Sequence, residues 1–252
     1  MKIAIITGAS AGLGREFVKQ LEANFPEIEQ VWLISRSEGK LQETAKVLTG
    51  AQAKVLPLDL CGESSLETLT AMLAEEKPEV TLLINNAGCG YLGNVGETEP
   101  ELQARMIDLN ARALTAVTHM VLPYMERGGR IINLCSIASF CPNPRMTVYS
   151  ATKACVAFFS RGLGVELKPK GITVTAVCPG PMATEFLDVG GIAGNSRTFD
   201  VLPYCDPVKV VKGAYAAAKA GRAVHTPRGF FKFYRVLAKI LPQRLMINFT
   251  KT

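Results

Sequence analysis

A tyrosine and a lysine four residues apart, in the segment YSATK, could carry acid–base chemistry. Tyr149 and Lys153 fall at the start of a predicted helix, 147–168, where residues at this spacing share one face. A nearby ammonium group stabilises a phenolate, so the tyrosine could exchange a proton nearer neutral pH. Ser136 ends the apolar run RIINLCS, and its hydroxyl could hydrogen-bond a substrate carbonyl as charge develops on the oxygen. A tyrosine–lysine pair alone is common and does not establish catalysis.

The glycine-rich segment ITGASAGLGRE (6–16) fits two different chemistries. Its G-x-S-x-G spacing, centred on Ser10, is that of a hydrolase nucleophile, which requires an acid and then a histidine later in the chain. Only His119 and His225 are available: His119 lies inside a long helical segment, which favours a structural role, and His225, with Asp200 or Asp206 before it, could complete a triad by order alone. The glycines at 8, 12 and 14 also form a turn between a strand and a helix, where a dinucleotide pyrophosphate binds. The position of the motif, directly after the first apolar run, favours the dinucleotide.

The end of the second apolar run indicates which dinucleotide. Arg36 follows WLIS, and no acidic residue lies at 35–37. An acid at this place would bind the ribose hydroxyls of NAD, whereas a cation suits the 2′-phosphate of NADP. We therefore expect NADP(H), and the alternative is a solvated arginine at the end of a strand. Ala11 offers no second basic residue inside the glycine motif, so the expectation rests on Arg36.

Short apolar runs alternate with longer helical segments along most of the chain. The runs are apolar at nearly every position, as in strands that helices cover on both faces. This alternation predicts an α/β fold, a single doubly wound Rossmann domain with a parallel sheet, over residues 1–227. The predicted strands are 2–7, 30–35, 53–58, 80–85, 130–135, 172–177 and 223–227, and the predicted helices are 13–25, 37–49, 63–77, 99–127 and 147–168.

The composition is that of a globular enzyme, with 48% hydrophobic and 20% charged residues among 252. No run of 18 uncharged apolar residues occurs, so we expect no membrane span. The seven cysteines form no C-x-x-C pair and no secretion signal precedes the glycine motif, which indicates reduced thiols and a cytoplasmic protein. We expect no metal site.

These motifs, taken in order, resemble those of the short-chain dehydrogenase/reductase family in its compact branch. The resemblance covers roughly residues 2–227, and seven matches in the right order make chance agreement implausible. The matching segments are TGASAGLG (7–14), DL (59–60), NNAG (85–88), Asn110, Ser136, YSATK (149–153) and PGPMAT (179–184).

The resemblance implies an oxidoreductase with four catalytic residues. Tyr149 would exchange the proton, while Lys153 would lower the tyrosine's pKa and hold the nicotinamide ribose. Ser136 would orient the substrate carbonyl. Asn110 would hold a water molecule that relays protons to Lys153. Cys135, at a position where the family often has serine, is expected to be buried and inert.

The resemblance also assigns a cofactor site. Asp59 and Leu60 would contact adenine, and Pro179, Gly180 and Thr184 would hold the nicotinamide end. Ser10 would lie near the 2′-phosphate with Arg36, as part of the cofactor turn and not as a nucleophile. Asn86 and Gly88 would line the adenine-ribose side and steady the central strands. The complete predicted set is Gly8, Ser10, Gly12, Leu13, Gly14, Arg36, Asp59, Leu60, Asn86, Ala87, Gly88, Tyr149, Lys153, Pro179, Gly180 and Thr184.

The C-terminal extension, 228–252, carries the whole net charge of +6. It contains six cations and no acid, so the rest of the chain is neutral and nucleic-acid binding has no charge support. Lys232, Arg235 and Lys239 recur at helical spacing among apolar residues, which is typical of a helix on a membrane surface or a partner. The alternatives are that its apolar side packs on the domain, or that it forms a wall of the substrate pocket.

The irregular segment 181–205 is predicted to be the substrate loop. Its apolar residues indicate a small-molecule substrate, namely a hydrophobic carbonyl compound or alcohol that is bulky and steroid- or lipid-like. The family implies a homodimer or homotetramer through helices 99–127 and 147–168. The alternative function is a non-catalytic NADP(H)-binding sensor or scaffold, which would have no need of all four catalytic residues. The residues expected to line the pocket are Met182, Phe186, Leu187, Ile192 and Phe199.

Overall fold

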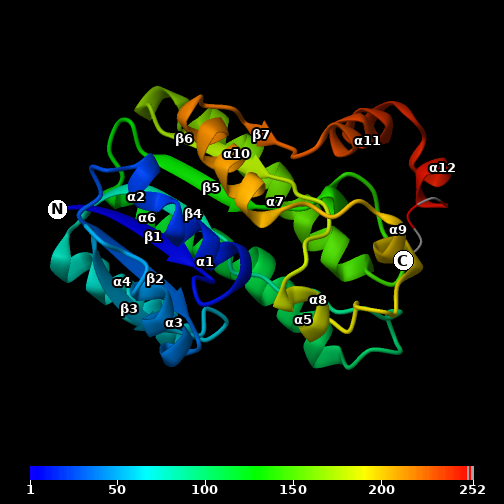
Figure 1. Ribbon diagram of the computed structural model, residues 1–252, viewed down its shortest axis with the longest axis horizontal. Helices are drawn as coiled ribbons and strands as arrows, with labels where there is room; N and C mark the ends of the chain where they lie inside the picture. The colour runs from blue at the N-terminus through cyan, green and yellow to red at the C-terminus, as the bar shows by residue number, and fades with distance from the viewer. Residues whose placement is uncertain (249, 251–252) are drawn as a thin grey trace.

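The computed structural model describes residues 1–248 and 250, and a seven-stranded parallel sheet forms its centre (Figure 1). The strand order is β3-β2-β1-β4-β5-β6-β7, so the winding reverses between β1 and β4. The doubly wound parallel sheet predicted from the sequence is confirmed. The strands are β1 (Lys2–Thr7), β2 (Gln30–Ser35), β3 (Gln52–Pro57), β4 (Glu79–Asn85), β5 (Arg130–Leu134), β6 (Thr173–Val177) and β7 (Val224–His225).

The central strands form where apolar side chains can be buried on both sheet faces. β1 is buried from Ile3 to Thr7 and pairs in parallel with β2 on one side and β4 on the other. β3, at the sheet edge, has only one fully buried residue, Leu56. The sequence pattern and the burial agree because a central parallel strand has no solvent-facing side.

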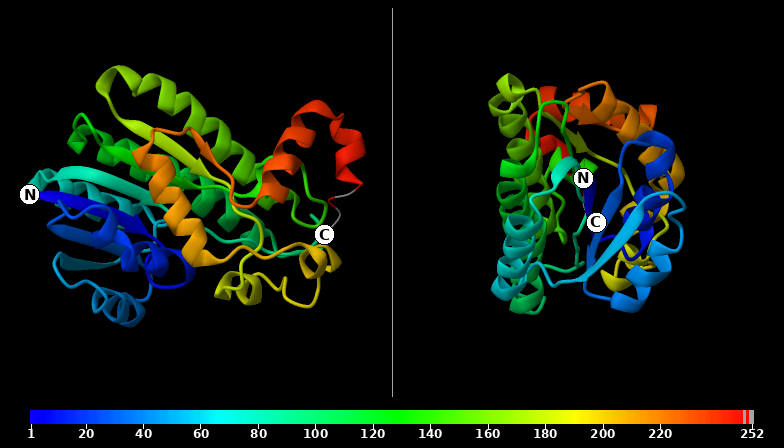
Figure 2. Two further views of the ribbon diagram at one scale, coloured as in Figure 1. Left: turned by 45° about the horizontal axis from the view of Figure 1, so that its top comes forward. Right: turned by 90° about the vertical axis from the view of Figure 1, so that its left-hand side faces the viewer.

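Helices cover both faces of the sheet, as the end-on view in Figure 2 shows. On one face the core includes Phe17 and Tyr215, and the Tyr215 hydroxyl donates to the Phe17 carbonyl oxygen at 2.7 Å. On the other face Leu69, Val117 and Leu163 pack against the strands. The first layer contains α1 (Gly12–Lys19), α2 (Leu21–Asn24), α3 (Glu38–Ala45) and α10 (Pro207–Lys219), and the second contains α4 (Glu63–Glu76), α6 (Leu114–Val121) and α7 (Thr147–Glu166).

The predicted helix 99–127 is interrupted in the structure. α5 (Pro100–Ile107) leads into a π-helical turn over Asp108–Ala113, and α6 follows it and ends in a 3₁₀ turn at Leu122–Tyr124. A π-helical turn adds a residue to a helix and is frequent at functional sites. One turn of altered pitch within a longer helix is too short for the apolar periodicity of the sequence to reveal.

The last strand is also shorter than predicted. β7 contains only Val224 and His225, because Pro227 has no N–H to donate and Arg228 adopts a φ of +62° that ends the extended conformation. After it the chain forms α11 (Gly229–Ile240) and α12 (Gln243–Ile247), at the end of the molecule to which the strands' carboxyl ends point (Figure 1). The substrate loop contains two short helices, α8 (Glu185–Val189) and α9 (Arg197–Val201). None of the helices in the described part of the chain is long and apolar enough to cross a bilayer.

Candidate active site

A cavity of about 690 Å³ lies at the carboxyl edge of the sheet, at the switch point between β1 and β4. Open α/β sheets bind their ligands at this place, and the volume suits a small-molecule ligand. Of the predicted site residues, Gly14 and Asn110 do not line the cavity. Those that do are Gly8, Ser10, Gly12, Leu13, Arg36, Asp59, Leu60, Asn86, Ala87, Gly88, Ser136, Tyr149, Lys153, Pro179, Gly180 and Thr184.

The glycine turn after β1 has the close approaches that its spacing predicts. Gly8 and Gly12 have φ values of +66° and +49°, which side chains rarely tolerate. A Cβ on Gly14 would lie 2.0 Å from the Gly8 carbonyl oxygen, so only glycine lets α1 start so near the strand. The Asn86 side chain donates to the carbonyl oxygens of Thr7 and Gly8 at 3.1 and 3.0 Å, which ties β4 to the turn.

Ser10 is part of this turn and has no histidine beside it. It lines the cavity, whereas His225 does not and instead lies against Gly213 of α10. His119 is exposed on α6. The structure therefore brings no hydrolase triad together at Ser10, and the serine faces the space that a dinucleotide phosphate would take.

Charged residues surround the cavity where β2 and β3 end. Arg36 and Lys40 line it, and Lys40 Nζ lies 2.9 Å from a carboxylate oxygen of Glu185 on α8. Asp59 pairs with Arg105 at 3.1 Å. Burial opposes ionisation of Asp59, but hydrogen bonds from the Cys61 backbone and Arg105 hold its pKa below the usual value. Lys40 and Arg105 could not be recognised from the sequence, because their partners lie far away in the chain.

Ser136, Tyr149 and Lys153 meet at the other end of the cavity. Ser136 follows β5, accepts a hydrogen bond from the Ala138 backbone at 3.1 Å and lies close enough to Tyr149 to lower the pKa of that phenol. Tyr149 and Lys153 lie on the same face of α7, with the lysine Nζ 5.7 Å from the centre of the tyrosine ring. The Lys153 ammonium donates to the Leu134 carbonyl oxygen at 2.8 Å, which anchors it beneath the site.

Burial dominates the electrostatics of this group. It raises the pKa of Tyr149 well above its ordinary value, although the hydrogen bond from Ser136 acts in the opposite direction. Burial also lowers the pKa of Lys153. The family resemblance implies that Lys153 lowers the tyrosine's pKa, and this role of the lysine stays a prediction.

Asn110 lies behind this group, in the π-helical turn. Its amide nitrogen donates to the Cys89 carbonyl oxygen at 2.8 Å and to Thr152 Oγ1 at 3.1 Å, and its oxygen accepts from the Cys89 N–H at 2.9 Å. A Cβ on Gly88 would lie 3.0 Å from Asn110 Oδ1 and 3.4 Å from Lys153 Nζ. The glycine thus leaves free the space between the asparagine and the lysine where the water relay is predicted.

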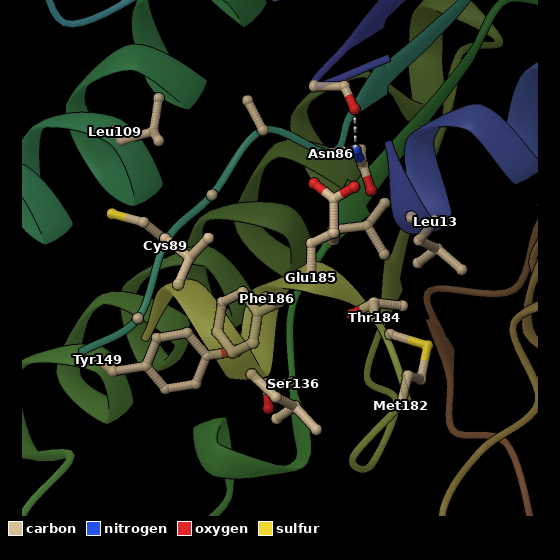
Figure 3. A pocket seen from close by; sticks show the side chains of 18 of the residues that line it. Leu13, Asn86, Cys89, Leu109, Ser136, Tyr149, Met182, Thr184, Glu185 and Phe186 are labelled. Atoms are coloured by element: carbon tan, nitrogen blue, oxygen red, sulfur yellow. Dashed lines mark hydrogen bonds between the residues drawn. The ribbon is translucent and has the colours of Figure 1, made fainter. Parts of the chain in front are cut away.

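The substrate end of the cavity is apolar. Phe186 of α8 lies beside Tyr149, with ring centres 5.7 Å apart (Figure 3). Gly90 makes this contact possible, since a Cβ there would lie 2.7 Å from Phe186 and 2.9 Å from Tyr149. Ile192 was predicted to line the pocket, and this is wrong: it is fully buried in the cluster beneath the loop. The other predicted lining residues are in place, namely Met182, Phe186, Leu187 and Phe199.

The nicotinamide end is supported by the C-terminal extension. Gly180 lies against the ring of Phe231 on α11, so that a Cβ on the glycine would lie 2.2 Å from the ring. Phe231 is fully buried. No residue from the described part of the extension lines the cavity itself. The tail therefore acts on the site from behind and does not form its wall.

The residues present fit a dinucleotide better than a metal. Three features match the parts of such a cofactor: a glycine turn with free space beside it, cations at the adenosine end, and a tyrosine–lysine pair at the other end. No group of three or more metal-ligating side chains exists among the described residues.

Comparisons with known proteins agree with this assignment. The sequence matches the family model for short chain dehydrogenases over residues 2–189. It is 31% identical over 209 residues to an uncharacterized oxidoreductase of Staphylococcus epidermidis, covering 82% of this chain and 89% of that protein. It is 36% identical over 193 residues to the very-long-chain 3-oxoacyl-CoA reductase of Anas platyrhynchos, covering 72% of this chain and 60% of that one.

Solved structures show the same likeness over nearly the whole chain. A short-chain dehydrogenase from Sphingobium yanoikuyae in complex with NADPH has a TM-score of 0.82 at 29% identity, covering 98% of this chain and 95% of that one. The bulky-bulky ketone specific alcohol dehydrogenase from Comamonas testosteroni has a TM-score of 0.75 at 29% identity, covering 98% and 94%. The chain belongs to the short-chain dehydrogenase/reductase family and is a hydride-transferring oxidoreductase.

Proposed function

We propose that the protein is an NADP(H)-dependent oxidoreductase that reduces a bulky apolar ketone or oxidises the corresponding secondary alcohol. The observation that carries the proposal is the meeting of Ser136, Tyr149 and Lys153 at the apolar end of a cavity whose other end is a glycine turn. Such a cavity can hold a dinucleotide and a substrate in line, with the acid–base group at their junction.

In the proposed reduction, a nicotinamide held beside Tyr149 and Lys153 would supply the hydride. Tyr149 gives its proton to the carbonyl oxygen, and the Ser136 hydroxyl hydrogen-bonds that oxygen as it becomes negative. Burial favours the neutral phenol of Tyr149, the form that reduction requires. Lys153, held by the Leu134 carbonyl, can return a proton to the tyrosine, and the space beside Gly88 could hold the water that reprotonates the lysine.

Two cations support NADP(H) over NAD(H). Arg36 and Lys40 both line the adenosine end of the cavity, where the two acids of the lining are paired, Glu185 with Lys40 and Asp59 with Arg105. A 2′-phosphate would find positive charge here, whereas the ribose hydroxyls of NAD would find no free carboxylate after β2. The NADPH complex of the Sphingobium yanoikuyae relative agrees with this preference.

The apolar walls support a large hydrophobic substrate. Met182, Phe186, Leu187 and Phe199 line the cavity from the loop, so a steroid- or lipid-like ketone would bury most of its surface against them. The names of the two relatives, a bulky-bulky ketone specific dehydrogenase and a very-long-chain 3-oxoacyl-CoA reductase, agree with this substrate class.

We also infer a homodimer or homotetramer formed through α5, α6 and α7. Ile107 of α5 and Phe158 and Val165 of α7 are large apolar residues with 53%, 77% and 74% of their surface exposed. Large exposed apolar residues on neighbouring helices are typical of a surface that a second copy covers. Residues 1–227 would then carry cofactor, substrate and subunit contacts, with 228–252 as an extension.

The experiment compares wild type with Tyr149→Phe. Initial rates of NADPH and NADH oxidation are measured with ketones graded from small diketones to steroids. We expect NADPH-dependent turnover that rises with substrate bulk and falls at least about a thousandfold in the variant, which keeps its NADPH affinity. Equal rates in the two proteins, or equal use of NADH, would contradict the proposal.

A further inference from the structure

The C-terminal helix α11 has one side that is anchored and one that is exposed. On the anchored side Phe231 is fully buried behind Gly180, and the Tyr234 ring lies 6.1 Å from that of Phe140. The Arg235 guanidinium donates to Thr226 Oγ1 at 3.2 Å. These contacts fix the rotation of the helix on the domain, so the opposite side has a defined composition.

The exposed side is strongly apolar. Phe230, Phe233 and Ile240 have 55%, 63% and 72% of their surface exposed, and Leu245 of the following helix α12 has 53%. Val236 lies between Phe233 and Ile240 on the same side and is 48% exposed. Exposed aromatic and aliphatic residues in one continuous patch mark a binding surface rather than ordinary protein surface.

Cations border this patch. Lys232 and Lys239 are exposed on one flank of α11, and Arg244 is exposed on α12. No acidic residue occurs from 228 onward, and no ion pair in the described part of the chain includes a cation of the extension. Their charge is therefore available to a negatively charged partner. Figures 1 and 2 show both helices projecting from one corner of the molecule.

We propose that the exposed face of α11 and α12 docks on an anionic lipid bilayer. Phe230, Phe233 and Ile240 would enter the boundary between headgroups and acyl chains, while Lys232, Lys239 and Arg244 contact lipid phosphates. A helix with an apolar face, cationic flanks and aromatic residues binds membranes in this way. A second copy of the chain is the weaker candidate occupant, since it would bring its own unpaired cations against these.

The proposal does not depend on the ketone or the cofactor. It does place the mouth of a site proposed for apolar substrates near a lipid surface, because Phe231 joins α11 directly to Gly180 in the cavity wall. Binding can be measured without turnover, so failure of the docking proposal and failure of the proposed function are distinguishable.

The test is co-sedimentation of the full chain with vesicles of phosphatidylcholine, with and without phosphatidylglycerol. We expect binding to the anionic vesicles only, weakened by added salt. The variant Phe233→Gln/Ile240→Gln should abolish it, and Lys232→Gln/Lys239→Gln should weaken it about tenfold or more. Matched controls are Val208→Gln on α10, an exposed apolar residue outside the proposed subunit surface, and Lys168→Gln/Lys170→Gln, an exposed cation pair outside the extension.

The thermal stability and the NADPH affinity of each variant are measured as controls for folding. We expect both to equal those of wild type, because Phe231 is unchanged. Absence of binding by wild type, equal binding to neutral vesicles, or equal losses in the control variants would overturn the proposal. The proposal would also be overturned if wild type bound no vesicles and the tail variants had a lower oligomeric mass than wild type, measured by light scattering. A second copy of the chain would then be the occupant of this face.

Discussion

The contact between Gly180 and Phe231 joins the C-terminal extension to the active site, and Gly180→Ala is the perturbation that tests it. The new Cβ would lie 2.2, 2.3 and 3.0 Å from three atoms of the phenylalanine ring. Carbon atoms in contact normally lie about 3.5–4.0 Å apart, so ring and turn must separate by more than 1 Å.

Neither partner can move easily. Gly180 lies between Pro179 and Pro181, whose φ angles are fixed, and the carbonyl oxygens of these prolines accept hydrogen bonds from Ile137 and Cys205 at 3.0 and 2.7 Å. Phe231 has no exposed surface into which its ring could turn. We therefore expect the full cost of overpacking, about 1–3 kcal/mol of unfolding free energy, or a fall in Tm of about 3–10 °C.

The assay is a double-mutant cycle with Phe231→Leu, following both Tm and the KM for NADPH. The smaller side chain leaves room for the Cβ, so the double variant should be more stable than the two single changes predict, by about 1 kcal/mol. The KM for NADPH should rise in Gly180→Ala and recover in the double variant, because the turn returns to its place. Additive effects on Tm would refute the proposed contact.

Three further changes have expected results. Arg36→Leu should lower kcat/KM with NADPH about 10- to 150-fold, which corresponds to the free energy of a hydrogen bond to a charged group. The kcat/KM with NADH should stay unchanged. Equal losses with the two cofactors would show that Arg36 does not bind the 2′-phosphate. Phe186→Ala should uncover Tyr149 and lower its raised pKa, so that ketone reduction declines at a lower pH than in wild type when kcat/KM is measured against pH. The pKa of Glu22 falls to about 2: burial opposes ionisation, but the N–H groups of residues 49–51 and the Thr49 hydroxyl stabilise the carboxylate. Its stabilising effect should therefore be present above pH 4.5 and disappear as the pH falls toward 2, at a cost of about 1 kcal/mol after solvent screening, and Glu22→Gln should lack this loss in denaturant titrations at several pH values.

Much of the fold follows from the sequence because central parallel strands must be apolar on both sides. Six of the predicted strands agree with the structure to within one residue at each end, and only the edge strand β7, limited by Pro227, is much shorter. The break in helix 99–127 could not be predicted, since one turn of altered pitch is too short to change the apolar periodicity recognisably. What fixes it is the side chain of Asn110, through hydrogen bonds to Cys89 and Thr152 that no sequence spacing contains.

The site was predictable where its geometry depends on local spacing. Gly8, Gly12 and Gly14 act within one turn, and Tyr149 and Lys153 within one turn of helix. The missed residues depend on contacts between distant segments. Lys40 meets Glu185 across the cavity, and Arg105 of α5 meets Asp59, which follows β3. Such contacts follow from the packing of loops and carry no periodic signal.

The extension shows most clearly where periodicity stops being informative. Phe231 and Phe233 are two residues apart and therefore about 200° apart around the helix, on opposite sides. Because both sides of α11 carry large apolar residues, the sequence could not decide which side packs on the domain, and the three alternatives for the tail stayed open. The structure decides by burying Phe231 against Gly180. Once that side is fixed, Phe233 and Ile240 cannot be explained by packing on the core. They lie beside unpaired lysines, which is the reason to look for a partner that is both apolar and negatively charged.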